Sequence, residues 1–284
     1  MSSSAVLIVN PASGSYSEER LMLAVGLLRE RFGEVSILRT GKRGDAEAMA
    51  RDAAAKSPEM ILSVGGDGTF NEVVNGTAFT DVPVAFVPAG TTNVLARELG
   101  LPGDIYDAVK ETLRGRPEYV HLGRINGRYF VLMAGIGFDG EAVWRVKQGL
   151  KRISGKGAYV LSGLGCFLRY RPGRLRIVID GRACEGYGLV ACNSGYYAGS
   201  FRICRGAGLG SPCLHVSVME GGRRSDLLRY VLRVVIGRPA VPACVEGRRI
   251  EVYGDAHIQV DGDYFGRTPA VITFHENALR LMVQ

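Results

Sequence analysis

The chain has 284 residues, of which 46% are hydrophobic and 22% are charged. This length supports one large or two medium domains with a sizeable core, and the composition excludes a disordered chain. No hydrophobic run reaches the roughly 20 residues that a membrane-spanning helix needs. The most apolar candidate covers only 157–168. The strand-like segment near the start is too short for a signal peptide, so we expect a cytoplasmic protein.

The formal net charge is +7, and much of it is concentrated in 142–179, a segment without acidic residues. Several aromatic residues lie among its basic residues. This composition is typical of a surface that docks on an anionic membrane or on nucleic acid, and it is equally typical of a solvated face.

Six cysteines and four histidines show no spacing that indicates a zinc site. We therefore expect buried, reduced thiols and structural histidines, as in a protein of a reducing compartment. The cysteines are residues 166, 184, 192, 204, 213 and 244, and the histidines are residues 121, 215, 257 and 275.

The first part of the chain alternates strand and helix patterns, which predicts a doubly wound, mainly parallel α/β sheet. The Ser15-to-Glu18 spacing is that of a capping box at the start of the first helix. Strands are predicted at 5–10, 35–39, 60–64 and 82–87, and helices at 18–32, 45–56, from 69, 92–99 and 105–114.

Strand and hairpin signals dominate from about Tyr119 onward. Asn126-Gly127 and Asp180-Gly181 each separate two strand-like runs, as in tight hairpins. The second part is therefore predicted to be a mainly antiparallel β domain with inserted helices. Its strands are expected at 189–193, 214–219, 249–253, 258–260, 270–274 and 279–283, and its helices at 140–148, 158–168 and 225–235.

A glycine-rich segment follows the predicted strand 60–64. It consists of Gly65-Gly66-Asp67-Gly68-Thr69, continued by Phe70-Asn71-Glu72-Val73-Val74-Asn75-Gly76. Glycines let backbone N–H groups approach a phosphate, and the helix that follows favours an anion at its N-terminus. Asp67 would repel phosphate, which indicates a bridging Mg²⁺ or a proton-accepting role. Thr69 and Glu72 also have the spacing of a capping box.

Two further loops follow predicted strands at the same edge of the sheet, where open α/β sheets bind ligands. They are Asn10-Pro11-Ala12-Ser13-Gly14 and Gly90-Thr91-Thr92-Asn93. Three such loops favour a nucleotide site more than any one of them does. Gly135-x-Gly137-x-x-Gly140 matches the dinucleotide fingerprint but lacks the acidic residue that should follow it, so we reject NAD binding there. The sequence has no P-loop motif.

Another polar segment, Asp261-Gly262-Asp263, lies near the C-terminus. Asp-Gly is a common turn dipeptide, so a hairpin turn accounts for it. The alternative is a general base that takes a proton from an attacking hydroxyl.

Together, these segments and Gly135-Ile136-Gly137-Phe138-Asp139 resemble the diacylglycerol kinase catalytic superfamily, in the family's order and over essentially the whole chain. The resemblance implies ATP bound in a cleft between an α/β domain and a β-sandwich. The implied domains are 1–120 and 121–275, with 276–284 returning to the first. It also implies Mg²⁺ and an ATP-dependent lipid kinase that phosphorylates diacylglycerol or a related lipid alcohol.

The resemblance also implies roles for individual residues. Asp263 is the expected proton acceptor, with Asp261 beside it, and Asp67 is a rival base or a partner of Mg²⁺. The implied nucleotide contacts are Asn10, Pro11, Ala12, Ser13, Gly14, Thr40, Gly65, Gly66, Asp67, Gly68, Thr69, Asn71, Glu72, Gly90 and Thr91.

Three positions depart from the family pattern. Asp263 stands where the family has glutamate, so its carboxylate has a shorter reach. The stretch 208–212 lacks the acids that hold a structural Mg²⁺ in bacterial diacylglycerol kinases, so that site is not expected here. Asn93-Val94 replaces a frequent Asn-Asp pair.

Two other functions stay open. An NAD kinase would explain Gly65–Thr69 but not Asn10–Gly14, and a non-catalytic lipid- or nucleotide-binding relative would fit the basic stretch. For a lipid kinase we expect peripheral attachment to an anionic membrane through 142–179 and no nucleic-acid partner. A homodimer is a further assembly that the resemblance allows.

Overall fold

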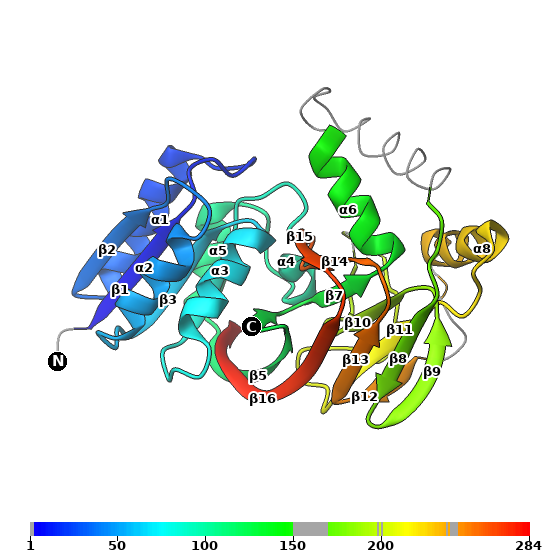
Figure 1. The fold of residues 1–284 in the computed structure, drawn as a ribbon. Helices are drawn as coiled ribbons and strands as arrows, with labels where there is room; N and C mark the ends of the chain where they lie inside the picture. The colour runs from blue at the N-terminus through cyan, green and yellow to red at the C-terminus, as the bar shows by residue number, and fades with distance from the viewer. Residues whose placement is uncertain (1–2, 150–169, 198, 200, 237, 239–243) are drawn as a thin grey trace. The chain divides into compact units, whose positions relative to one another are not determined.

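The fold is described from a computed structural model of the chain (Figure 1). The structure describes all residues except 1–2, 150–169, 198, 200, 237 and 239–243. The chain divides into two compact units. Unit 1 comprises Met1–Leu122 and His275–Gln284 with a short segment around Gly199, and unit 2 comprises Gly123–Tyr197 and Phe201–Phe274.

Unit 1 is built on a parallel sheet with the strand order β2-β1-β3-β4, extended by the last part of β16, where Leu281 pairs with Val84. The β/α alternation of the sequence produces this sheet, and the predicted fold class is confirmed. The strands are β1 (Ser4–Val9), β2 (Glu34–Arg39), β3 (Met60–Gly65) and β4 (Val84–Pro88). The helices are α1 (Glu18–Arg31), α2 (Asp45–Ala54), α3 (Asp67–Thr77), α4 (Val94–Glu98) and α5 (Ile105–Thr112).

Aliphatic side chains fix the helices of unit 1 on the sheet. Leu7, Leu62 and Val87 from the strands pack with Leu21 of α1 and Val109 of α5 in one fully buried cluster. Burying each such side chain contributes about 1.5–3 kcal/mol. The rigid sheet that results holds the loops at its carboxyl edge in place.

Helices α2 and α3 lie in close contact, and Gly76 makes this possible. A Cβ atom at Gly76 would lie 2.4 Å from the carbonyl oxygen of Glu47 on α2. A side chain at this position would therefore push the two helices apart. Gly76 is a packing residue of the glycine-rich segment rather than a ligand-binding one.

Unit 2 contains two sheets that enclose a second core. One has the order β16-β13-β8-β9, with β5 and β6 beside it, and the other has the order β12-β11-β10-β7-β14-β15. The buried residues of this core include Ile136, Ile177, Val216 and Ile272. The predicted second part, an antiparallel β-sandwich-like domain, is confirmed.

The elements of this part of the chain have the following bounds. The strands are β5 (Arg116–Ile125), β6 (Arg128–Phe130), β7 (Met133–Ile136), β8 (Leu175–Ile179), β9 (Arg182–Gly186), β10 (Leu189–Cys192), β11 (Leu214–Val218), β12 (Val245–Gly247), β13 (Arg249–Tyr253), β14 (His257–Val260), β15 (Asp263–Arg267) and β16 (Ala270–Val283). The helices are α6 (Phe138–Gly149) and α8 (Arg224–Val235).

Both predicted hairpin turns form. Asn126 and Asp180 adopt φ values of 43° and 45°, and the glycine after each also has a positive φ. Two left-handed residues in succession match the right-handed twist of the flanking strands, which is why Asn-Gly and Asp-Gly occupy such turns.

The structure corrects four details of the sequence predictions. The N-cap of α1 is Ser17, whose side chain accepts a hydrogen bond from the Arg20 amide, so the capping box expected from Ser15 to Glu18 is wrong. The strands expected at 270–274 and 279–283 form one continuous strand, β16. Helix α4 begins at Val94 rather than 92, because Asn93 is in the left-handed conformation. Cys204 and Cys244 form a disulfide, so the expectation of reduced thiols is wrong for this pair. The helix expected at 158–168 lies outside the described residues.

Within the described ranges, none of the helices has the length and apolar character required to cross a bilayer.

Candidate functional site

The loops predicted to bind a nucleotide all lie at the carboxyl edge of the unit 1 sheet. Loop 10–14 follows β1, Thr40 follows β2, Gly66 follows β3 and loop 89–93 follows β4. Because these four strands are parallel neighbours, their carboxyl ends meet at one edge. The structure therefore brings to one edge the three loops that the sequence placed there, and Thr40 lies at the same edge. Ligands of open α/β sheets bind at such an edge.

Loop 10–14 is held by backbone and side-chain contacts of Asn10. Its side-chain oxygen accepts a hydrogen bond from the Ala12 amide at 3.0 Å, and its Nδ2 donates to Oγ1 of Thr69 at 3.0 Å. The first contact shapes the loop, and the second ties it to α3. Pro11 and Ala12 stay exposed at the tip. The loop is thus rigid at its base and accessible at its tip.

Glycines allow loops 65–69 and 89–93 to touch. A Cβ atom at Gly90 would lie 2.6 Å from the Cα atom of Gly66, and a Cβ atom at Gly65 would lie 2.7 Å from the side chain of Thr69. A Cβ atom at Gly14 would lie 2.7 Å from Oγ1 of Thr91. A larger residue at Gly90 would therefore displace the backbone of Gly66, and one at Gly65 or Gly14 would displace a threonine side chain. These approaches leave backbone, rather than side chains, at the surface of the edge.

Helix α3 has no side-chain cap at its N-terminus. The helix begins at Asp67, and its cap position is Gly66, which has no side chain to satisfy the first amides. Uncapped amides at a helix N-terminus attract an anion such as a phosphate. The capping-box interpretation of Thr69 and Glu72 is wrong, because both residues lie inside the helix.

Thr69 and Glu72 have other partners. Thr69 accepts the hydrogen bond from Asn10, and Oε1 of Glu72 accepts one from the amide of Gly44 at 2.9 Å. Gly44 precedes α2 and has a φ of 91°, so Glu72 fixes the loop that follows Thr40. Asn71 lies buried on α3, where its backbone and side-chain oxygens accept hydrogen bonds from Asn75. Glu72 and Asn71 thus form hydrogen bonds to other protein groups, and they support the site indirectly.

Asp67 connects the glycine-rich segment to α4. Its Oδ2 accepts a hydrogen bond from the Val94 amide at 2.9 Å, and its Oδ1 accepts one from the Leu95 amide at 3.1 Å. Burial raises the pKa of Asp67, and these amide hydrogen bonds oppose the rise. The carboxylate therefore caps α4, a short helix that its own cap residue, Asn93, leaves without a side-chain hydrogen bond.

The predicted aspartate pair lies in unit 2, at the turn between β14 and β15. Asp261 and Gly262 have φ values of 47° and 86°, so the segment is a tight hairpin turn. The carboxylate of Asp261 is buried and accepts three backbone hydrogen bonds of 2.9 Å, from the amides of Val131, Leu132 and Met133. Asp261 thus anchors the turn to the start of β7.

Asp263 differs from Asp261 in its surroundings. It is the first residue of β15 and is partly exposed, whereas Asp261 is only 9% exposed. The two carboxylates therefore have different surroundings, although they are two positions apart. Asp261 is held by three backbone amides, and Asp263 is partly exposed.

A buried network that the sequence did not predict supports this turn. The Gly262 amide donates to Oε1 of Gln259 at 2.8 Å, and Nε2 of Gln259 donates to Oδ2 of Asp139 at 2.5 Å. The hydroxyl of Tyr197 donates to the other carboxylate oxygen of Asp139. Burial raises the pKa of Asp139, and the two hydrogen bonds partly offset this effect.

Asp139 also explains the glycines of the rejected dinucleotide fingerprint. A Cβ atom at Gly135 would lie 1.8 Å from Oδ2 of Asp139, and one at Gly140 would lie 2.2 Å from the backbone oxygen of His257. These glycines seat α6 and its aspartate against β7 and β14. The sequence signal for this role was the Gly-x-Gly-x-Asp spacing, which was already part of the family resemblance.

Comparisons with known proteins agree with this architecture. Residues 4–125 match the diacylglycerol kinase catalytic domain, and residues 133–283 match the YegS C-terminal NAD kinase beta sandwich-like domain. A diacylglycerol kinase of Staphylococcus carnosus is 30% identical over 278 residues, which cover 93% of this chain and 90% of the relative. One of Bacillus subtilis is 29% identical over 276 residues, with coverage of 93% and 90%.

A crystal structure of a putative diacylglycerol kinase from Bacillus anthracis has the same fold, with a TM-score of 0.81. It is 22% identical and covers 100% of this chain and 98% of that one.

The two units and the two domain matches place the chain in the class of lipid kinases. The chain belongs to the diacylglycerol kinase catalytic domain family, as the two domain matches and the identities to curated relatives establish. The predicted family and the prediction of a lipid kinase are thereby confirmed. A kinase family of this kind implies ATP as the phosphoryl donor.

Proposed function

We propose that the chain transfers the γ-phosphoryl group of ATP to the hydroxyl of diacylglycerol or a closely related lipid alcohol. The observation that carries this proposal is the edge of the unit 1 sheet, where four strand-end loops meet beside the uncapped N-terminus of α3. The curated relatives named diacylglycerol kinase support the choice of acceptor.

In this proposal, ATP is bound mainly by backbone groups. The amides of Gly66 and Gly68 and the N-terminus of α3 receive the phosphates, because these positions carry no side chain that would block them. Loops 10–14 and 89–93, with Thr40, surround the rest of the nucleotide. Phosphoryl transfer needs positioning and charge stabilisation more than covalent chemistry, so a rigid backbone site suits it.

Asp263 is the proposed general base. The lipid hydroxyl oxygen forms a bond to the γ-phosphorus, the bond from that phosphorus to the β,γ-bridging oxygen breaks, and ADP leaves. The hydroxyl proton passes to the carboxylate of Asp263. Asp261 fits this task less well, because three amide hydrogen bonds already occupy its carboxylate. Asp67 is likewise committed to two amides of α4.

Mg²⁺ is the proposed companion of ATP, and it would offset charge on the phosphates. The residue that fits it is Asp67, whose carboxylate lies in the first turn of α3 and would contact a water of the ion's shell. The stretch 208–212 does not fit a structural Mg²⁺. It has no carboxylate, and the hydroxyl of Ser211 donates to the carbonyl oxygen of Gly206.

The lipid acceptor implies work at a membrane surface. Most of the proposed docking segment, 142–179, lies outside the described residues. In its described part, Arg145 pairs with Glu141 at 2.6 Å and Trp144 stacks on His257. Those two side chains are therefore engaged within unit 2 rather than presented to a lipid.

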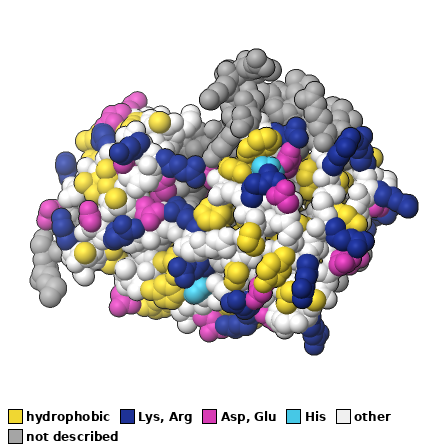
Figure 2. Space-filling model, viewed as in Figure 1, with side chains coloured by type: hydrophobic (Ala, Val, Ile, Leu, Met, Phe, Trp, Pro, Cys, Tyr) yellow, Lys and Arg dark blue, Asp and Glu magenta, His cyan; other side chains and the backbone are white. Residues whose placement is uncertain are grey.

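Helix α8 is a further surface that fits an anionic bilayer. Its Leu228 and Leu232 and the adjacent Ile236 are 45%, 49% and 63% exposed and follow one another at helical spacing. Arg224 and Arg229 are exposed on the same helix. Elsewhere on the displayed face, basic side chains are scattered among acidic ones (Figure 2). Apolar residues flanked by arginines are typical of helices that lie in the interface of a membrane.

A homodimer is a further proposal, and it does not depend on this surface.

The proposed function is tested with γ-labelled ATP and a panel of acceptors. Vesicles of an anionic phospholipid are offered with diacylglycerol, with a sphingoid base or with neither, and NAD is offered in a separate reaction. We expect label in the diacylglycerol product and none in NADP. Label in NADP alone would support the NAD kinase alternative, and no labelled product with any acceptor, total lipid extract included, would support a non-catalytic relative.

A further inference from the structure

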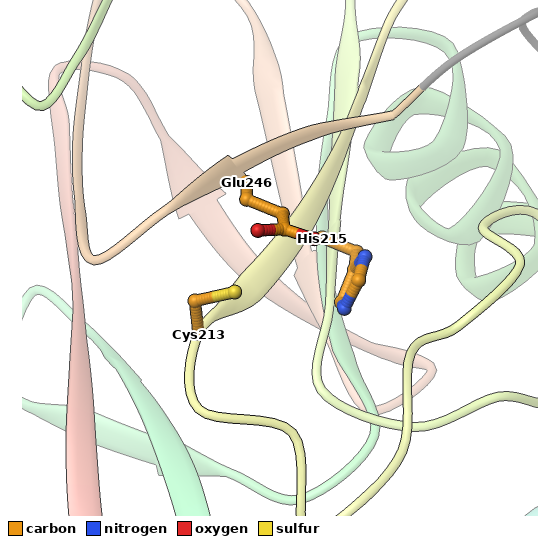
Figure 3. A group of neighbouring side chains, drawn as sticks. All are labelled: Cys213, His215 and Glu246. Carbon is orange, nitrogen blue, oxygen red and sulfur yellow. The ribbon is translucent and has the colours of Figure 1, made fainter.

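Three side chains with metal-binding atoms meet in unit 2, at residues that the proposed kinase mechanism does not use. Cys213 precedes β11, His215 lies on β11, and Glu246 lies on β12. The cysteine sulfur, a histidine ring nitrogen and a glutamate carboxylate oxygen all lie within 4.8 Å of one another (Figure 3). Of the residues that the structure describes, these form the one such group with three metal-binding side chains.

Strand geometry brings the three side chains together. Alternate residues of a strand point to the same face, so Cys213 and His215 share one face while Leu214 and Val216 fill the core from the other. Strand β12 runs antiparallel to β11, with Glu246 directly opposite His215. Directly opposed residues of neighbouring strands have adjacent side chains. The cluster therefore follows from the register of the sheet.

The surrounding chain holds this arrangement. Gly206, with a φ of 89°, passes over the imidazole, and a Cβ atom there would lie 3.5 Å from Cε1 of His215. The Cys204–Cys244 disulfide joins this loop to the chain just before β12. Cys213 and His215 are buried, whereas Glu246 is exposed and can adjust its rotamer. Two donors are thus largely shielded from bulk water, and the carboxylate of Glu246 already contacts the thiol of Cys213.

We propose that Cys213, His215 and Glu246 bind one Zn²⁺ ion, with a water molecule as the fourth ligand. Thiolate, imidazole and carboxylate are the ligands that Zn²⁺ takes, whereas Mg²⁺ and Ca²⁺ prefer oxygen alone. Zinc–ligand distances of about 2.0–2.3 Å require donor atoms roughly 3.5 Å apart in a tetrahedron. The three donor atoms lie within 4.8 Å of one another, so a bound ion would have to draw them closer together.

The position of the site indicates a structural role. Strand β12 has three residues and forms one edge of the six-stranded sheet, and β15, which begins with Asp263, forms the opposite edge. A Zn²⁺ ion would clamp the short edge strand to β11. It would act on the stability of unit 2 and not on the phosphoryl transfer. The site also differs in residues and in ligand chemistry from the carboxylate Mg²⁺ site that 208–212 lacks.

The test is a titration of the untagged, metal-free full chain with Co²⁺ and then Zn²⁺, with the disulfide left intact. We expect one equivalent of Co²⁺ to give a thiolate-to-cobalt charge-transfer band in the near ultraviolet, which Zn²⁺ abolishes. Cys213→Ser should remove the band, and His215→Ala and Glu246→Gln should each weaken Co²⁺ binding about tenfold or more. Zn²⁺ should raise the melting temperature of the wild type.

Cys184→Ser is the matched control, because Cys184 is also a free cysteine of unit 2 but lies exposed on β9. It should leave the band and the affinity unchanged. Glu246→Gln alters an exposed side chain, so it keeps the test decisive if a buried variant fails to fold. The absence of a charge-transfer band in the wild type, or cobalt binding that survives both Cys213→Ser and Glu246→Gln, would overturn the proposal.

Discussion

The glycine loops of unit 1 and the aspartate turn of unit 2 are built in opposite ways. In unit 1 the absence of side chains shapes the site, because Gly65, Gly66 and Gly90 let backbone segments touch. In unit 2 side chains shape the site. Hydrogen bonds of Asp261, and of Gln259 with Asp139, hold the two-residue turn in place. The first arrangement suits the binding of phosphates, and the second suits the placing of a single carboxylate.

This difference determines what a substitution should change. An added methyl group at a touching glycine displaces a loop, so it should weaken nucleotide binding. Removal of the Asp263 carboxylate leaves the loops unaltered, so it should reduce turnover at unchanged ATP affinity. Removal of the buried Asp261 carboxylate should lower the free energy of unfolding. The two regions therefore predict three separable outcomes.

The largest effect is expected for Asp263→Asn. The amide cannot accept the proton of the lipid hydroxyl, so turnover should fall about 10²- to 10⁴-fold. The measurement is the initial rate of labelled lipid formation at saturating ATP. Asp255→Asn, at an exposed carboxylate of the same unit, is the control and should keep the wild-type rate. A rate near that of the wild type for Asp263→Asn would exclude this residue as the base.

The next effect concerns Gly90→Ala. The new Cβ atom would lie 2.6 Å from both the Cα atom of Gly66 and Oδ1 of Asn93, so the two loops must separate. Overpacking of this kind costs about 1–3 kcal/mol. We expect the Kd for ATP to rise about tenfold, as measured by calorimetry. Gly103→Ala has open space around its Cβ position and should bind ATP like the wild type. Equal affinities of the two variants would contradict the loop contact.

Asp261→Ala should act on stability. Three buried amides, those of Val131, Leu132 and Met133, would lose their charged acceptor. Such a loss costs about 2–4 kcal/mol of unfolding free energy, which urea denaturation measures. Asp263→Ala, two residues away and partly exposed, should cost under about 1 kcal/mol. Equal destabilisation by the two substitutions would contradict the anchoring role of Asp261.

The smallest effect is a pH dependence caused by His257. Burial lowers its pKa, and Glu141 opposes this, while Arg267, Arg145 and Asp255 add smaller contributions. The unfolded chain thus binds the proton more readily than the folded one. Unfolding free energy should therefore be highest above the ordinary histidine pKa of about 6.5 and fall as the pH drops below it.

His257→Gln should flatten this dependence between about pH 7.5 and about pH 5.5 in urea denaturation. His121→Gln, at a histidine whose Nδ1 accepts a hydrogen bond from the Asn277 amide in unit 1, is the control. The same slope in the His257→Gln variant as in the wild type would show that another group is responsible.

How much the sequence predicts depends on whether a feature is local. The loops 10–14, 65–69 and 90–93 were predictable because each directly follows a strand, and parallel strands must end at one edge. The two hairpin turns were predictable because Asn-Gly and Asp-Gly favour left-handed backbone. In each case the residues that determine the feature are adjacent in the chain.

The missed features join distant segments. Asp139 meets Gln259 across 120 positions, and Glu72 meets Gly44 across 28, so no local pattern indicates either contact. The same holds for Cys213, His215 and Glu246, whose convergence depends on the register of β11 and β12. The capping-box prediction at Thr69 failed because α3 begins earlier, at Asp67, and the hydroxyl of Thr69 instead accepts a hydrogen bond from Asn10 of another loop.

Phosphate binding by the glycine loops and proton transfer to Asp263 are separable, and one measurement tests this division most directly. It is the Kd for ATP of the Asp263→Asn variant, determined by equilibrium dialysis beside the wild type and Gly90→Ala. We expect a value within about twofold of the wild type, although turnover is lost. A loss of ATP affinity as large as that of Gly90→Ala would contradict it.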